Sequence, residues 1–144
     1  AGGATFQAIN IQRARIEGLE IHYGQTLGEW TLDANATWQD PRDLDSDLRL
    51  LRRPGRKASL QLGRPIGDRW DFGLEALGFS ARRDFVGDLG GYGLINLNAQ
   101  FAMTRNWVLE ARLNNALNRE YVEVDGFNTD DANGWLLLRW NPAE

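Results

Sequence analysis

The sequence has no cysteine, one histidine, four prolines and no long apolar run. Without cysteine the chain cannot form disulfides, bind zinc through thiolates or use a thiol as a nucleophile. His22 alone cannot supply a histidine metal triad, and the sequence contains no catalytic constellation. A transmembrane helix needs about 18 or more apolar residues, whereas the longest apolar run covers only residues 135–138. We therefore expect no transmembrane helix, no enzyme activity and no bound metal or cofactor.

The chain also lacks an excess of basic charge. Its 16 Lys and Arg are outnumbered by 20 Asp and Glu, which leaves a formal net charge of -4. Proteins that bind nucleic acids usually carry a basic surface, so nucleic acid is not an expected partner. A length of 144 residues with 42% hydrophobic residues fits one folded domain rather than a disordered chain.

The dominant pattern in the sequence is strict alternation of apolar and polar residues. In residues 29–39 the even positions run from Trp30 to Trp38 and are apolar, while the odd positions are polar. A period of two is typical of a β-strand with one apolar face. The pattern recurs in residues 19–24, 57–63, 70–76, 95–101, 107–114 and 136–140. The sequence predicts an all-β antiparallel structure of about seven strands, with no segment at helical spacing.

One change of parity interrupts this pattern. Leu77 and Phe79 fall on the face that Glu75 occupies, although Trp70 to Ala76 place apolar residues on the other face. An extra residue in one strand shifts the parity in this way, and glycine often marks the position. We therefore expect a β-bulge beside Gly78.

The connections between the expected strands alternate in length. Short links lie near residues 27–29, 65–68 and 104–106, and long links cover residues 40–55, 82–91 and 118–133. All short links then lie at one end of the sheet and all long links at the other. Outer-membrane β-barrels have this layout, with tight periplasmic turns and long extracellular loops. The pattern predicts a transmembrane β-barrel segment in the bacterial outer membrane, in contact with lipid and lipopolysaccharide.

Residue types on the two faces agree with this interpretation. Aromatic residues near the ends of the apolar faces are typical of a membrane girdle, namely Trp30, Trp38, Trp70, Phe101, Trp107 and Trp140. Polar residues expected to face a wet lumen are Asp33, Asn35, Glu75, Asn96, Asn98, Glu110 and Arg112. A soluble β-barrel that binds a small ligand would also alternate, with its apolar residues inward, and is the alternative.

The number of strands bears on whether the barrel is complete. Complete bacterial barrels have an even number of strands. An open sheet of seven strands would leave two unpaired edges in lipid, which is very costly. We therefore expect residues 1–144 to be the C-terminal portion of a larger barrel whose earlier strands lie upstream.

Four sequence segments resemble the C-terminal end of the TonB-dependent outer-membrane receptors. In residues 10–20 an Ala-Arg pair precedes a Gly-x-Glu, and residues 34–40 resemble the following strand and its exit. Residues 52–58 are similar to the family's Arg-Pro-x-x-Lys strand entry, and residues 113–121 to its Asn-Leu-Phe-Asp and Tyr signature. Within the family, residues 121–129 look most like the last external loop of the cobalamin transporters.

The resemblance implies active uptake of a small-molecule ligand, with cobalamin first and siderophores as the alternative. It also implies two partners, a plug domain of the same full-length chain and the TonB protein, which acts through an N-terminal part absent here. Candidate ligand or rim residues are Arg52, Arg53, Arg56, Asp125 and Asn128. The arginines suit lipopolysaccharide phosphates or an anionic ligand, since guanidinium groups form charge-assisted hydrogen bonds to phosphate. A passive pore without a plug is a further alternative.

Overall fold

The computed structural model describes residues 13–142. Residues 10–12 of the segment with the Ala-Arg pair therefore lie outside the described part of the chain. Within residues 13–142 no helix is long and apolar enough to cross a membrane.

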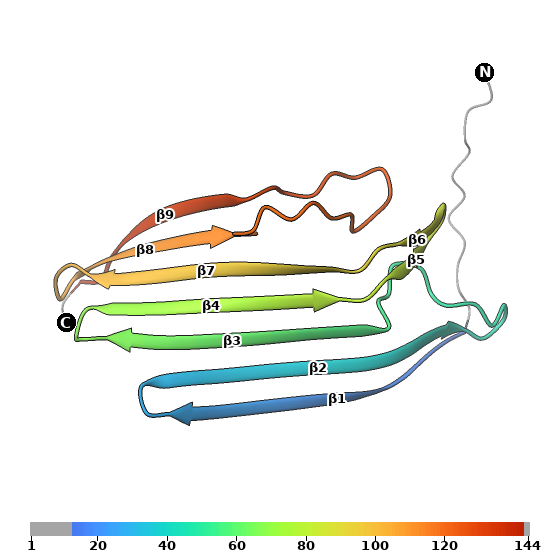
Figure 1. Ribbon diagram of the computed structural model, residues 1–144, viewed down its shortest axis with the longest axis horizontal. Coiled ribbons are helices and arrows are strands. Elements are labelled where there is room, and N and C mark those ends of the chain that lie inside the picture. The colour runs from blue at the N-terminus through green and yellow to red at the C-terminus, as the bar shows by residue number, and fades with distance from the viewer. Residues whose placement is uncertain (1–12, 143–144) are drawn as a thin grey trace, which may run out of the picture.

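Seven long strands form a single antiparallel sheet in the order β1-β2-β3-β4-β7-β8-β9 (Figure 1). Their bounds are β1 Ala14–Leu27, β2 Trp30–Asp43, β3 Arg56–Ile66, β4 Trp70–Phe79, β7 Tyr92–Ala102, β8 Trp107–Asn114 and β9 Asn133–Trp140. Each strand pairs with its neighbours in chain order, apart from a short hairpin inserted between β4 and β7. This hairpin consists of β5 Arg82–Asp84 and β6 Gly87–Leu89 and forms its own two-stranded sheet. The predicted seven-stranded antiparallel sheet is confirmed, whereas the hairpin lies in a segment predicted to be a loop.

The connections divide between the two ends of the sheet as predicted. Tight turns join β1 to β2, β3 to β4 and β7 to β8 at one end, and the long connections lie at the other (Figure 1). Gly28 and Gly67 occupy two of the tight turns with φ of 61° and 60°. A positive φ of this kind carries little cost for glycine, which lets the chain reverse within a few residues.

The strand register separates an apolar face from a polar face. Leu32 pairs with Leu62, and the same row continues through Leu74, Leu97 and Leu113 across five strands. The next row, one residue along, contains Asp33, Gln61, Glu75 and Asn96. Residues directly opposite each other in adjacent strands share a face, so these two rows lie on opposite faces of the sheet.

The expected bulge beside Gly78 is not present. The register runs without interruption from Ser59 paired with Leu77 to Lys57 paired with Phe79. Phe79 therefore stays on the polar face, where its ring packs 5.0 Å from the ring of Tyr92. A local aromatic cluster thus explains the change of parity, and the bulge prediction was wrong.

Candidate functional site

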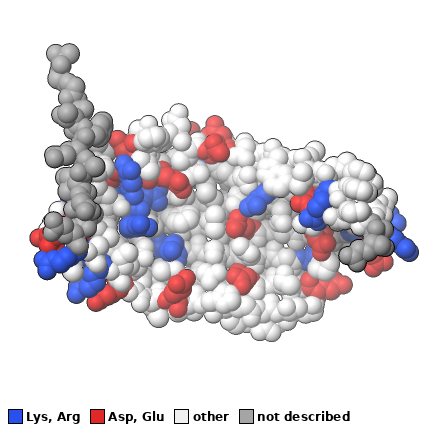
Figure 2. Space-filling model, turned by 180° about the vertical axis from the view of Figure 1, so that it is seen from behind, with Lys and Arg blue, Asp and Glu red and all other residues white. Residues whose placement is uncertain are grey.

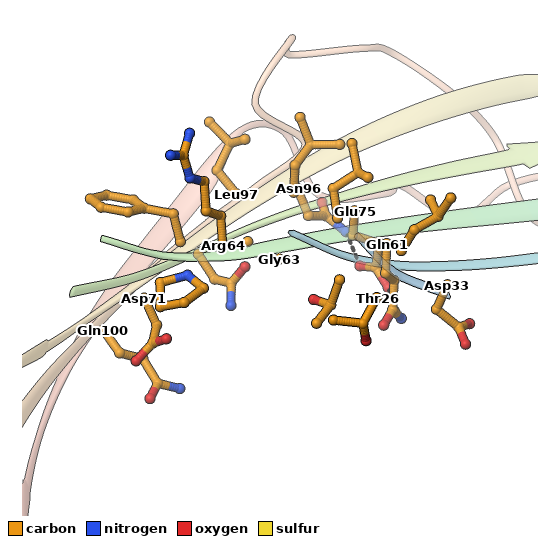
Figure 3. A pocket seen from close by; sticks show the side chains of 18 of the residues that line it. Thr26, Asp33, Gln61, Gly63, Arg64, Asp71, Glu75, Asn96, Leu97 and Gln100 are labelled. Atoms are coloured by element: carbon orange, nitrogen blue, oxygen red, sulfur yellow. Dashed lines mark hydrogen bonds between the residues drawn. The ribbon is translucent and has the colours of Figure 1, made fainter. Parts of the chain in front are cut away.

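The polar face carries a hollow of about 920 Å³ near the middle of the sheet (Figure 3). In this view Asp33, Asp71 and Gln100 extend from one side of the strands, whereas Arg64 and Leu97 extend from the other. Its lining comes from β1, β2, β3, β4, β7 and β8. The hollow is therefore built by six of the seven long strands, rather than by a single loop or strand.

Glu75 is the central acceptor of this polar face. Its Oε2 accepts a 2.7 Å hydrogen bond from Asn96 Nδ2, and Oε1 accepts one of 3.4 Å from Gln61 Nε2. Arg112 lies 3.5 Å from the same carboxylate across β7. The side chain of Glu75 therefore links β3, β4, β7 and β8.

Further polar pairs lie on either side of Glu75. His22 Nε2 lies 2.6 Å from Asp33 Oδ2, and Asn35 donates a hydrogen bond to the other oxygen of Asp33. On β9, Arg139 forms a 3.0 Å ion pair with Glu110. The middle of the apolar face carries no charged side chain among the described strands, so Figure 2 displays the polar face, over which acidic and basic groups are scattered.

All the residues predicted to face the lumen lie on this polar face. The register puts them on the same side of β2, β4, β7 and β8, namely Asp33, Asn35, Glu75, Asn96, Asn98, Glu110 and Arg112. Their contact with a lumen stays a prediction. What the structure establishes is that they share one face and that several are joined by hydrogen bonds.

The predicted girdle residues lie on the apolar face, but not evenly. Those near the tight turns are Trp30, Trp70, Phe101, Trp107 and Trp140, and only Trp38 lies toward the long loops. Trp70 stacks on Phe101 with 4.4 Å between ring centroids, and Arg64 covers Trp30 at 4.9 Å. Most of the predicted girdle residues therefore lie at the tight-turn end, where the apolar part of the Arg64 side chain extends the aromatic row.

At the opposite end, two buried charged residues of β5 hold the connection between β8 and β9. The side chain of Arg82 donates hydrogen bonds to the carbonyl oxygens of Val122 at 2.7 Å and Glu123 at 3.2 Å. Its guanidinium also lies over the ring of Tyr92. Tyr92 in turn packs on Tyr121 and donates a 2.7 Å hydrogen bond to the carboxylate of Glu123.

Asp84 makes the complementary contacts. One carboxylate oxygen accepts a 2.9 Å hydrogen bond from the backbone N–H of Asp125, and the other accepts bonds from Phe85 N and Arg52 Nε. The side chain of Asp84 is fully enclosed. The hydrogen bond from the Asp125 amide, reinforced by Phe85 and Arg52, outweighs burial and holds the pKa of Asp84 below its usual value.

The same connection, which we call the last external loop (residues 115–132), is also braced internally. Buried Asn115 accepts a hydrogen bond from Arg119 N and donates to the carbonyl oxygens of Arg119 and Asp130. Thr129 donates to the carbonyl of Tyr121. Asn115 adopts a positive φ of 48°, a conformation that asparagine tolerates better than most residues.

The candidate rim residues do not form one patch. Arg52 forms an ion pair with Asp84, whereas Arg53 is exposed and Arg56 lies in the row of Trp38, at the long-loop end of the apolar face. Asp125 contributes its backbone N–H, and Asn128 is exposed. Arg82, Asp84 and Tyr92 were not among the sequence candidates. The segment of Arg82 and Asp84 has no long alternation, and no sequence signal marks their loop partners, which are backbone groups about 40 residues away.

The family model described as TonB dependent receptor-like, beta-barrel matches residues 1–116. The chain belongs to the TonB-dependent receptor family. This family lies in the bacterial outer membrane, and so does the sheet described here. In outer-membrane barrels the apolar face is the one toward lipid, and the end with the long loops is the external end.

A sequence relative in the TonB-dependent receptor family is the vitamin B12 transporter BtuB of Vibrio vulnificus (strain YJ016). It is 31% identical over 129 residues, which cover 83% of this chain and 19% of the relative. The chain thus spans about a fifth of the length of this relative.

Solved structures of the TonB-dependent receptor family share the fold. FpvA of P. aeruginosa, solved with heterologous pyoverdines, has a TM-score of 0.76 and 21% identity, covering 88% of this chain and 19% of that chain. The copper transporter OprC has a TM-score of 0.71 at 21% identity, covering 88% and 23%. At these identities the likeness concerns the fold alone.

Proposed function

We propose that the chain is the C-terminal barrel portion of an active outer-membrane transporter that takes up cobalamin. The observation that carries the choice of ligand is the 31% identity with a protein named as a vitamin B12 transporter. The 21% identity with a pyoverdine-bound receptor supports only the common fold. Cobalamin is therefore placed ahead of siderophores.

In this proposal an upstream part of the full-length chain supplies the plug and the contact with TonB. The polar face, with Glu75 and its hydrogen-bond partners, faces that plug and the lumen water. The external end presents the last external loop to the ligand, with Asn128 and Asp125 as candidate contacts. Lipopolysaccharide would meet Arg56, which lies in the row of Trp38 at the external end of the apolar face.

A siderophore receptor of the same family is the second candidate. A passive pore would take up the same molecules without TonB, and a soluble ligand-binding barrel would not require a membrane. The outer-membrane family favours a membrane barrel over the soluble protein. The dependence of uptake on TonB separates active transport from passive flow.

The test uses the full-length protein in a host that lacks its own vitamin B12 transporter. We expect uptake of labelled cyanocobalamin to appear with the protein and to vanish when the host also lacks TonB. The matched arm measures uptake of a ferric siderophore in the same cells. Siderophore uptake without cobalamin uptake would show that the ligand is a siderophore. Uptake of both molecules in cells without TonB would show a passive pore instead of an active transporter.

A further inference from the structure

We propose that Arg82 and Asp84 act as positioning residues that hold the last external loop in its ligand-contacting shape before any ligand arrives. We call these two side chains and the backbone of residues 122–125 the loop clamp. The identity of the ligand in this proposal rests on the proposed function. The loop clamp does not, because it is a property of the receptor without ligand.

The loop clamp pairs groups of opposite polarity at two points, one at Arg82 and one at Asp84. Arg82 and Asp84 are alternate residues of β5, so their side chains extend from the same side of the strand, about 7 Å apart. Within the loop, Arg82 is hydrogen-bonded to two carbonyl oxygens, and Asp84 to one backbone N–H. Asp84 forms its ion pair with Arg52 rather than with Arg82. The two charges therefore act on the loop, rather than on each other.

Burial makes the loop clamp selective for one arrangement of the loop. Arg82 is 7% exposed and Asp84 is 2% exposed. A buried charge is tolerated only when hydrogen bonds or an opposite charge compensate for its lost hydration. Any arrangement that shifted the loop but kept these charges covered would leave Arg82 without both of its carbonyl acceptors and Asp84 without one of its amide donors. The arrangement of the loop seen in the structure is thus favoured in the absence of ligand.

Arg82 and Asp84 contact backbone atoms of the loop and leave the side chains of Phe127 and Asn128 exposed. Asp125 contributes only its N–H to the clamp, and the exposed side chains of Phe127 and Asn128 follow within three residues. The loop can therefore present these side chains to a ligand from a fixed backbone. A preorganised surface binds more tightly than a mobile one, because less conformational entropy is lost on binding.

Hydrogen exchange of the full-length receptor, without ligand and in outer-membrane vesicles, tests the proposal. The Asp125 amide, which donates to Asp84, should be strongly protected in the unaltered protein, as measured in overlapping peptides that contain it. Asp84→Asn places an N–H2 group against one of the backbone or guanidinium donors, so exchange there should accelerate about tenfold or more. Arg82→Gln should accelerate the same peptides. Asp88→Asn, in the same hairpin but exposed, is the matched control and should change nothing.

A second measurement separates positioning from simple support of the fold. In Asp84→Asn cells the half-saturation concentration for cyanocobalamin should rise several-fold, while the maximal uptake rate per folded receptor stays unchanged. Heat-dependent gel mobility reports the amount of folded barrel. Rapid exchange of the Asp125 amide in the unaltered empty receptor would overturn the proposal, and so would unchanged exchange of this amide in both clamp variants. Protected exchange without any cobalamin uptake would overturn the proposed ligand and leave the clamp standing.

Discussion

The protonation state of Asp84 affects the last external loop, because N–H donors enclose its carboxylate. Hydrogen bonds from Asp125, Phe85 and Arg52 lower the pKa of Asp84, so its charged form is favoured when the loop is in place. The stabilisation is therefore present above the pKa of a free aspartate, about 3.9, and is lost as the pH falls through the lower pKa of the folded protein. We expect the last external loop to loosen only in that acidic range.

A nitroxide attached at Asn128→Cys in the full-length receptor would report this loosening. Its spectrum should stay that of a constrained label from pH 7 to about 4 and become mobile at lower pH. The Asp84→Asn variant lacks the carboxylate that holds the loop, so the label should be mobile. Because this variant has no carboxylate to protonate there, its spectrum should be the same at every pH. A transition near pH 6 would point instead to a histidine or to a different group.

Glu75 carries a second prediction for a single residue. Replacing it with alanine removes the acceptor of Asn96 and Gln61 and the partner of Arg112. We expect Glu75→Ala to lower the free energy of unfolding by about 1 kcal/mol, because lumen water replaces part of the lost bonding.

Urea unfolding of the full-length receptor in lipid vesicles measures this loss. Asp71→Ala, on the same strand and face, is the control, because the structure gives Asp71 no side-chain hydrogen bond among the described residues. An equal decrease in the free energy of unfolding in the two variants would contradict the prediction that the hydrogen bonds of Glu75 stabilise the barrel.

Among the elements, β3 offers the sharpest test of which face meets lipid. Leu60 lies midway along its apolar face, and the neighbouring Ser59 lies on the polar face. Leu60→Arg should destabilise the barrel by about 2–4 kcal/mol, the cost of an arginine near the middle of the bilayer. Ser59→Arg should change the stability by less than about 0.5 kcal/mol, as is usual at a solvated position.

Unfolding in vesicles compares these two variants directly. If Ser59→Arg were the damaging change and Leu60→Arg the harmless one, the assignment of the apolar face to lipid would be wrong.

The elements also show which features the sequence can reveal. Alternation from Trp30 to Trp38 identifies a strand because a one-layer sheet gives its two faces different solvents. The hairpin β5–β6 has three residues per strand, too few for a period to emerge. Phe79 misleads for a different reason: its ring packs on Tyr92, which in turn packs on Tyr121 of the last external loop, and local spacing does not contain such tertiary contacts.

For the whole molecule, the unpaired edges of the sheet are the dominant feature. Among the described residues, β1 and β9 each pair on one side only. A strand edge in lipid leaves backbone N–H and C=O groups without partners, and each such group costs several kcal/mol. The side chains of Leu136 and Leu138 do not cover the edge of β9, because they extend from its apolar face, perpendicular to the unpaired backbone groups.

The 144-residue chain expressed alone should therefore not persist as a monomer in lipid. We expect it to aggregate or to associate through its edges, since edge strands readily pair with other chains. Refolding into lipid vesicles, followed by crosslinking and gel electrophoresis with and without heating, measures this behaviour. The full-length receptor is the control and should give one compact species whose mobility changes on heating. A stable monomer of the isolated chain would mean that its edges satisfy each other, so that seven strands close by themselves and no further strands are needed.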